Sequence, residues 1–97
     1  MTKTELVDAV ARRQNIPRGI AERVVNVLFD GIRDALVRGD RVEIRGFGTF
    51  QARHYQGYTG RNPRTGQPIV VAPKVLPVFR VGKELRMRMN GGIDPEG

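Results

Sequence analysis

The sequence of 97 residues contains no cysteine, no tryptophan and no serine. It therefore has no disulfide framework, no thiolate ligand for zinc, and neither a cysteine nor a serine nucleophile. The single histidine, His54, leaves no pair of imidazoles for a metal ion. These absences exclude much of enzyme and metal-site chemistry. We expect a protein without catalytic activity, metal, cofactor or small-molecule substrate.

Long apolar runs are missing as well, and none approaches the ~20 residues that a membrane-spanning helix needs. Residues 2–8, Thr-Lys-Thr-Glu-Leu-Val-Asp, lack the apolar core of a signal peptide. Two glycine-containing stretches also fail the phosphate-loop patterns. Gln51 stands where a dinucleotide loop has its third glycine, and Glu84 follows Lys83 where a P-loop has Ser or Thr. We expect a cytoplasmic protein that does not use a membrane.

Positive charge is concentrated in one part of the chain. There are 17 Lys and Arg against 10 Asp and Glu, for a net charge of +7. Residues 1–40 carry a net charge of +1, residues 41–90 carry +8 and residues 91–97 carry −2. A one-sided basic field favours a polyanion, nucleic acid first and an anionic membrane surface second. The alternative is a solvated basic surface that only aids solubility.

The first 40 residues have the pattern of a helical hairpin. Thr2 and Glu5 have the spacing of a capping box, which predicts a helix over residues 3–15. Pro17 suits the first turn of a second helix, and Gly39 is a natural left-handed stop. Apolar residues at intervals of three and four define one face of that helix: Ile20, Val24, Val27, Leu28, Gly31, Ala35 and Leu36.

The next part of the chain has strand patterns. Polar and apolar side chains alternate on both sides of a Gly-Phe-Gly bend at residues 46–48. Further strands are expected near residues 68–72 and 75–79, where Pro77 indicates a sheet edge. A short basic helix is expected at residues 83–89. The segment 91–97 is rich in Gly, Pro and acid and is predicted to be disordered.

Residues 61–66, Arg-Asn-Pro-Arg-Thr-Gly, have the composition of a hairpin tip. Asn62 suits the first position of a type I turn and Pro63 the second, and Gly66 suits a left-handed position. The flanking ribbon carries little to bury, and an isolated two-stranded ribbon is marginal in water. Because Arg61 and Arg64 stand at the tip, an anionic partner is expected. Pro63 is either an ordinary turn residue or an apolar wedge between DNA base steps.

Several of these motifs together resemble the bacterial HU/IHF family of DNA-bending nucleoid-associated proteins. The matching elements are Thr-Glu-Leu-Val at 4–7, Gly-Phe-Gly-Thr-Phe at 46–50, Thr-Gly-Arg-Asn-Pro-Arg-Thr-Gly at 59–66 and Gly-Lys-Glu-Leu at 82–85. Residues 43–48 and 82–86 are most similar to the beta-subunit branch of integration host factor. Val81, where the family commonly has Pro, and Gln-Gly-Tyr at the arm base (56–58) depart from the pattern.

The resemblance implies an α+β fold in a single DNA-binding domain over residues 1–90. A helical hairpin (1–40) forms the base, and an antiparallel three-stranded sheet (41–80) forms a saddle. A β-ribbon arm extends over residues 53–74, and a short helix follows at 82–90, before a disordered acidic tail at 91–97. It also implies an intertwined dimer, either with itself or with a related alpha-like subunit. Its shared core is expected to bury Leu28, Phe47, Phe50 and Phe79.

The expected function is bending of double-stranded DNA through the minor groove, serving nucleoid organisation, recombination, replication and transcription. Pro63 is predicted to intercalate, with Arg61, Asn62 and Arg64 in the groove. Glu43 and Arg45 are likewise predicted at the minor groove, where they would bias the choice of site; the alternative is a surface ion pair. Phosphate contacts are predicted for ten residues: Lys3, Gly46, Gly48, Arg53, His54, Lys74, Arg80, Lys83, Arg86 and Arg88. The alternatives are a packaging protein with little sequence preference and a protein or membrane adaptor.

Overall fold

The first helix, α1 (Lys3–Gln14), has the limits that its capping residues predict. A computed structural model describes all residues, 1–97. The Thr2 hydroxyl accepts a hydrogen bond from the Glu5 N–H at 3.2 Å, which satisfies one of the free amides of the first turn. Asn15 ends the helix in the left-handed conformation, with φ of 51°. The predicted start and end of this helix are confirmed.

The second helix, α2 (Arg18–Val37), packs against α1 through small side chains. Val7 of α1 meets Ala21 and Val25 of α2, and these three are the fully buried hydrophobic residues of the chain. The face predicted from the periodicity lies beside this contact, and its members Val24 and Leu28 are more than half exposed. Helix α2 therefore has two apolar faces, of which α1 covers the one with the smaller residues.

The sheet has the strand order β1 (Val42–Ile44), β2 (Gly48–Tyr55), β5 (Lys74–Val81), with both pairings antiparallel. Strand β1 pairs with β2 only as far as Val42 opposite Phe50. Beyond that point β2 and β5 continue as a two-stranded ribbon. Pro77 lies in the edge strand β5, as its missing N–H predicts.

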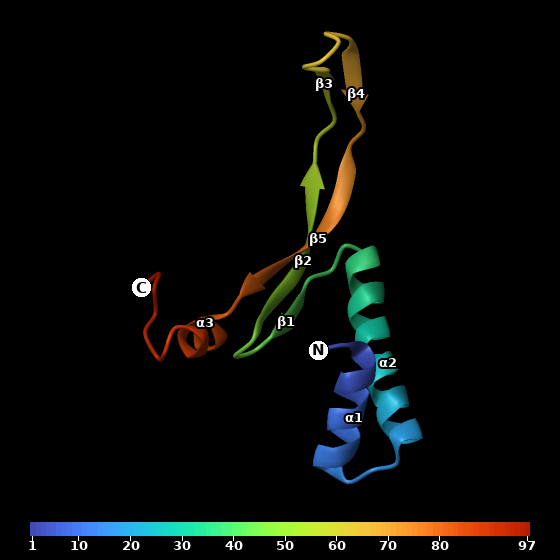
Figure 1. Ribbon diagram of the computed structural model, residues 1–97, viewed down its shortest axis with the longest axis vertical. Helices are drawn as coiled ribbons and strands as arrows, with labels where there is room; N and C mark the ends of the chain where they lie inside the picture. The colour runs from blue at the N-terminus through green and yellow to red at the C-terminus, as the bar shows by residue number, and fades with distance from the viewer.

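The ribbon extends into an arm made of β3 (Tyr58–Arg61) and β4 (Pro68–Val71). Residues 56–57 and 72–73 interrupt the ladder between the two sheets. Figure 1 shows the arm rising away from the helices, with α3 (Lys83–Met89) at the opposite end of the sheet. The α+β class, with helical hairpin, three-stranded sheet, arm and C-terminal helix, is confirmed.

The shape of the chain is extended. Its principal dimensions are 60 × 37 × 28 Å and its radius of gyration is 19.4 Å. A compact domain of about 100 residues has a radius near 13 Å. None of its helices is long and apolar enough to cross a membrane. The chain by itself thus leaves much of its apolar surface in contact with water.

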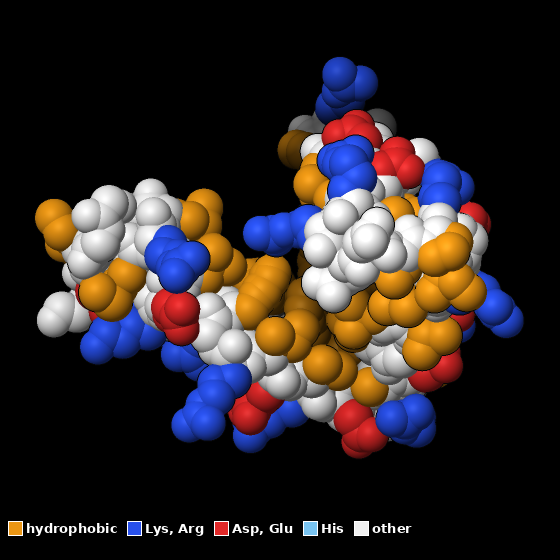
Figure 2. Space-filling view, turned by 90° about the horizontal axis from the view of Figure 1, so that it is seen from below, with side chains coloured by type: hydrophobic (Ala, Val, Ile, Leu, Met, Phe, Trp, Pro, Cys, Tyr) orange, Lys and Arg blue, Asp and Glu red, His pale blue; other side chains and the backbone are white.

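One face of the sheet carries this apolar surface. Phe79 packs against Phe50 at 4.9 Å between ring centroids and against Phe47 at 5.3 Å. An open groove of about 770 Å³ lies between this face and α2, lined by residues that include Phe29, Leu36 and Phe50. Figure 2, seen from below, shows hydrophobic side chains gathered in the middle of the molecule, with charged side chains of both signs around the outside.

Segment 91–97, here called the tail, was predicted to be disordered, but the structure folds it back on α3. Gly91 and Gly92 both adopt positive φ, 65° and 92°. The Gly92 N–H donates to the Met87 carbonyl at 2.8 Å, which reverses the chain direction. This reversal brings the acidic residues of the tail beside the basic residues of α3. Two adjacent glycines permit the turn because they lack a Cβ.

The bend at Gly48 leads to a stability prediction. Gly48 is buried, and a Cβ there would lie 2.5 Å from both the Arg80 carbonyl oxygen and the Phe79 ring. Gly48→Ala should therefore lower the free energy of unfolding by about 1–3 kcal/mol, measured by urea denaturation at one fixed protein concentration. Gly19→Ala is the matched control, because nothing lies within 4 Å of that position. Equal stabilities of the two variants would contradict the packing described for Gly48.

Candidate nucleic-acid interface

The face of the sheet opposite the phenylalanines carries the basic side chains of β2 and β5, together with the apolar side chains of Leu76 and Val78. Side chains alternate between faces along a strand, and directly opposed residues in an antiparallel pair share a face. Thr49 opposes Arg80, Arg53 opposes Leu76 and Tyr55 opposes Lys74. Arg53, Lys74 and Arg80 therefore lie on the same face, and all three are exposed. The Lys74 ammonium also lies 5.6 Å from the centroid of the Tyr55 ring.

His54 lies on the other face of β2. It opposes Val75 and borders the apolar groove beside α2. The sequence prediction grouped it with Arg53 as a phosphate contact, but neighbouring residues of a strand point to opposite sides. The structure thus separates His54 from the basic face that holds Arg53.

Most basic side chains of residues 41–90 form no ion pair within the chain. Arg41, Arg86 and Arg88 are paired with carboxylates. The other seven are Arg45, Arg53, Arg61, Arg64, Lys74, Arg80 and Lys83. Lys3, at the start of α1, is likewise exposed and unpaired. The basic excess is therefore available to an external anion.

Glu43 forms an ion pair with Arg41 and not with Arg45, the partner that the sequence suggested. Its carboxylate pairs with Arg41 at 3.1 Å, and Arg45 forms no ion pair. Glu43, Arg45, Gly46 and Gly48 line one open hollow of about 510 Å³ at the bend. Gly46 is exposed there with φ of 81°, whereas Gly48 is buried. The structure therefore brings these four predicted residues together but exposes only three of them.

The arm tip is a turn closed by its own polar groups. The Asn62 side-chain oxygen accepts from the Arg64 N–H at 2.8 Å, and the Gly66 N–H donates to the Asn62 carbonyl at 2.7 Å. Gly66 has φ of 73°, as the sequence predicts. Pro63 is exposed at the centre of this turn, with exposed Arg61 and Arg64 on either side. The turn thus presents an apolar ring flanked by two guanidinium groups.

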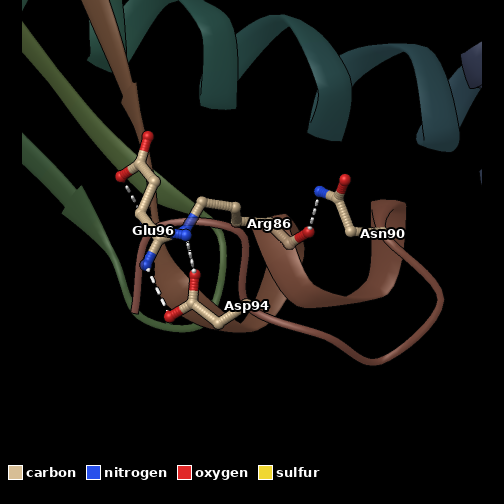
Figure 3. A network of polar contacts seen from close by, with 4 residues as sticks. All are labelled: Arg86, Asn90, Asp94 and Glu96. Carbon is tan, nitrogen blue, oxygen red and sulfur yellow. Dashed lines mark hydrogen bonds and ion pairs between the residues drawn. The ribbon is translucent and has the colours of Figure 1, made fainter.

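Helix α3 carries three of the predicted phosphate residues in different states. Lys83 is unpaired, and Arg88 is 80% exposed with Glu84 at 4.0 Å. Arg86 is only 19% exposed, because Asp94 of the tail lies against it. Its Nε donates to Asp94 Oδ1 at 2.8 Å and its Nη2 donates to Oδ2 at 3.1 Å, as Figure 3 shows. Glu96 adds a longer contact at 3.6 Å.

The pair alters the protonation of both partners. The hydrogen bond from Arg86 lowers the pKa of Asp94 to about 2, aided by a hydrogen bond from the Glu96 N–H. The same hydrogen bond raises the pKa of Arg86 above its ordinary value. This contact was not predicted from the sequence. The feature that could have indicated it is the Gly-Gly pair shortly after the basic helix, followed by an acidic residue.

A basic sheet face, an exposed basic arm and a helical base together define an α+β nucleic-acid-binding protein. A model of the family described as bacterial DNA-binding protein matches residues 1–90. The chain belongs to this family, whose members are DNA-binding architectural proteins of the HU type. The assignment agrees with the resemblance found in the sequence motifs.

Solved structures of similar proteins have the same fold. HU of Anabaena, in a cocrystal with DNA, is 35% identical over 92% of this chain and 97% of its own, with a TM-score of 0.82. HU from Thermotoga maritima is 26% identical over 92% of this chain and 98% of its own, with a TM-score of 0.65. A mutant of transcription factor 1 is 26% identical over 94% and 92%, with a TM-score of 0.64.

The Arg86–Asp94 pair predicts a pH effect of definite sign. Because the folded-state pKa of Asp94 lies below the ordinary 3.8, the pair stabilises the docked tail above pH 3.8. This stabilisation is lost as the pH falls through about 2. Carboxyl carbon NMR should give a midpoint near 2 for Asp94, and a clearly higher midpoint in Arg86→Gln, because the largest cause of the lowered pKa is removed. An unchanged midpoint in that variant would contradict the assigned cause.

Proposed function

We propose that the chain bends double-stranded DNA by inserting Pro63 of its arm into the minor groove, as an architectural protein of the nucleoid. The observation that carries this proposal is the arm tip, where the exposed Pro63 stands between two exposed arginines that form no ion pair, and Arg61 Nη1 donates to the Gly66 carbonyl at 3.2 Å. Apolar wedges of this kind unstack a base step and kink the duplex, and positive side chains beside them follow the groove. The Anabaena HU of the same fold was crystallised with DNA, which supports DNA as the ligand.

The proposal includes a dimer, for which the exposed apolar surface is the support. Leu28, Phe47 and Phe79 are 55%, 39% and 43% exposed in the single chain. Large hydrophobic side chains in such numbers are rarely left in water, and the groove between α2 and the sheet offers a continuous surface. A second copy, or a related alpha-like chain, would complete a core around Leu28, Phe47, Phe50 and Phe79. Two arms would then reach the duplex.

Phosphate contacts would supply most of the affinity. Basic side chains on one face of the sheet, on α3 and at the start of α1 would neutralise phosphates along the flanks of the bent duplex. The contacts proposed are those of Lys3, Arg53, Lys74, Arg80, Lys83, Arg86 and Arg88, together with the backbone around Gly46 and Gly48. His54 lies on the opposite face, and no phosphate contact is required of it.

Sequence preference would arise near the bend and from DNA deformability. The minor groove distinguishes little more than A·T from G·C, so the readout is coarse. Arg45 is unpaired beside the hollow at residues 43–48, whereas Glu43 is held by Arg41. We propose that Arg45 with Glu43 biases the choice of site, as in the beta-subunit branch of integration host factor. Such selectivity would suit recombination, replication and transcription.

The first prediction for this function concerns salt. If about eight phosphates are neutralised, the logarithm of the association constant should fall with a slope of about −7 against the logarithm of the salt concentration. Affinity would drop by about four orders of magnitude between 50 and 200 mM salt. Fluorescence anisotropy with a labelled duplex measures this slope. A slope near zero would contradict the phosphate contacts. It would favour the alternative function, an adaptor that binds a protein or a membrane surface.

The second prediction concerns the wedge. Pro63→Ala should bind a duplex of about 35 bp nearly as well as the unchanged chain but bend it less, because the methyl group is too small to hold a step open. Energy transfer between dyes at the two ends of the duplex measures the bend. Pro68→Ala is the matched control. Pro68 is also exposed in the arm, but it lies in strand β4 opposite Arg61 of β3 and not in the turn at the tip. Equal bending by the Pro63 variant would contradict the wedge.

The same assay with the purified chain alone separates the remaining alternatives. Bending by this chain alone indicates that a homodimer suffices, whereas bending only after addition of an alpha-like subunit indicates a heterodimer. Equal bending of a random and an A-tract duplex would favour a packaging protein with little sequence preference. Stronger bending of one duplex would favour a site-selective protein.

A further inference from the structure

We propose that the tail, residues 91–97, is an intramolecular competitor of DNA that occupies Arg86 until a phosphate displaces Asp94. This inference rests on the proposed function, because it assumes that Arg86 contacts the DNA backbone. It adds a regulatory contact within the chain to that function.

The geometry of the contact is that of anion recognition. Two guanidinium nitrogens of Arg86 donate to the two oxygens of Asp94 at 2.8 and 3.1 Å. Arginine binds a phosphate through the same pair of parallel hydrogen bonds. A phosphate and the Asp94 carboxylate therefore cannot occupy this fork together. Figure 3 shows Asp94 and Glu96 on the guanidinium group of Arg86.

The contact changes the accessibility of Arg86. The side chains of Arg86 and Asp94 are 19% and 14% exposed, whereas that of Arg88, two residues further along the same helix, is 80% exposed. Lys83 lies near enough to lower the pKa of Asp94 further. The tail thus places its negative charge among the cations of α3 and reduces the positive potential that DNA would meet there.

The tail is held by local contacts that can be released without unfolding the body. Its fold depends on the positive φ of Gly91 and Gly92 and on hydrogen bonds between residues close in the sequence, such as that from the Glu96 N–H to Asp94 Oδ1 at 3.1 Å. No hydrophobic residue of the tail is buried, and Ile93 is 72% exposed. The apparent affinity for DNA is then reduced by the fraction of molecules with Arg86 occupied.

A purely structural role for the pair has different consequences. If Asp94 only fastens α3, its removal would loosen the helix and leave DNA affinity unchanged or weaker. If Asp94 competes with phosphate, its removal would strengthen binding although it removes a stabilising contact. The sign of the change in affinity distinguishes the two roles.

The test compares full-length variants by fluorescence anisotropy on one 35-bp duplex at fixed salt. Asp94→Asn should bind about three- to tenfold more tightly than the unchanged chain, because Arg86 is freed. Asp34→Asn is the matched control: it removes the same charge from an exposed ion pair on α2, with Arg33 at 3.2 Å. Urea denaturation confirms that each variant is folded.

The Arg86→Gln background completes the test. Asp94→Asn should have no effect there beyond that of Asp34→Asn, because the residue it competes for is gone. Equal affinities of Asp94→Asn and the unchanged chain, or a gain that persists in the Arg86→Gln background, would overturn the competition by the tail. Neither result would contradict the proposed function. Failure of every form to bind the duplex would overturn the proposed function, and the competition with it.

Discussion

The structure depends on apolar contacts that one copy of the chain does not complete. Val7, Ala21 and Val25 form a small core between the two helices, while the phenylalanines of the sheet stay partly in water beside an open groove. A chain this short buries little surface by itself, and the apolar side chains it leaves exposed are those that the second chain of the proposed dimer would cover.

The alternation of side chains along β2 and β5 separates scaffold from ligand-binding surface. Phe50 and Phe79 point to the side of α2, and Arg53 and Arg80 point away from it. One short sheet therefore carries an apolar face for assembly and a basic face for an anion. The same alternation explains why adjacent His54 and Arg53 belong to different surfaces. The basic side chains also differ in their availability to an anion. Most of those in residues 41–90 form no ion pair, whereas Arg86 is held by Asp94 of the tail.

Local chemistry made much of the fold predictable. Caps such as Thr2 and Asn15, the stop at Gly39 and the Asn62–Gly66 turn depend on residues within a few positions of one another. Their preferred dihedral angles and hydrogen bonds are properties of short segments, which is why helix limits and the arm tip agree with the sequence predictions. The family motifs at 46–50 and 59–66 likewise indicated the DNA-binding class that the comparison with known proteins established.

The order of helices and strands, the tip of the arm and the family therefore follow from the sequence alone. Three contacts became clear only in the folded chain: the apolar face of α2 that meets α1, the pairing of Glu43 with Arg41, and the closure of Asp94 on Arg86. For each of these contacts the sequence offers several possible partners of the right chemical type. Only the packed backbone, with its Gly91–Gly92 reversal and its antiparallel register, selects among those partners.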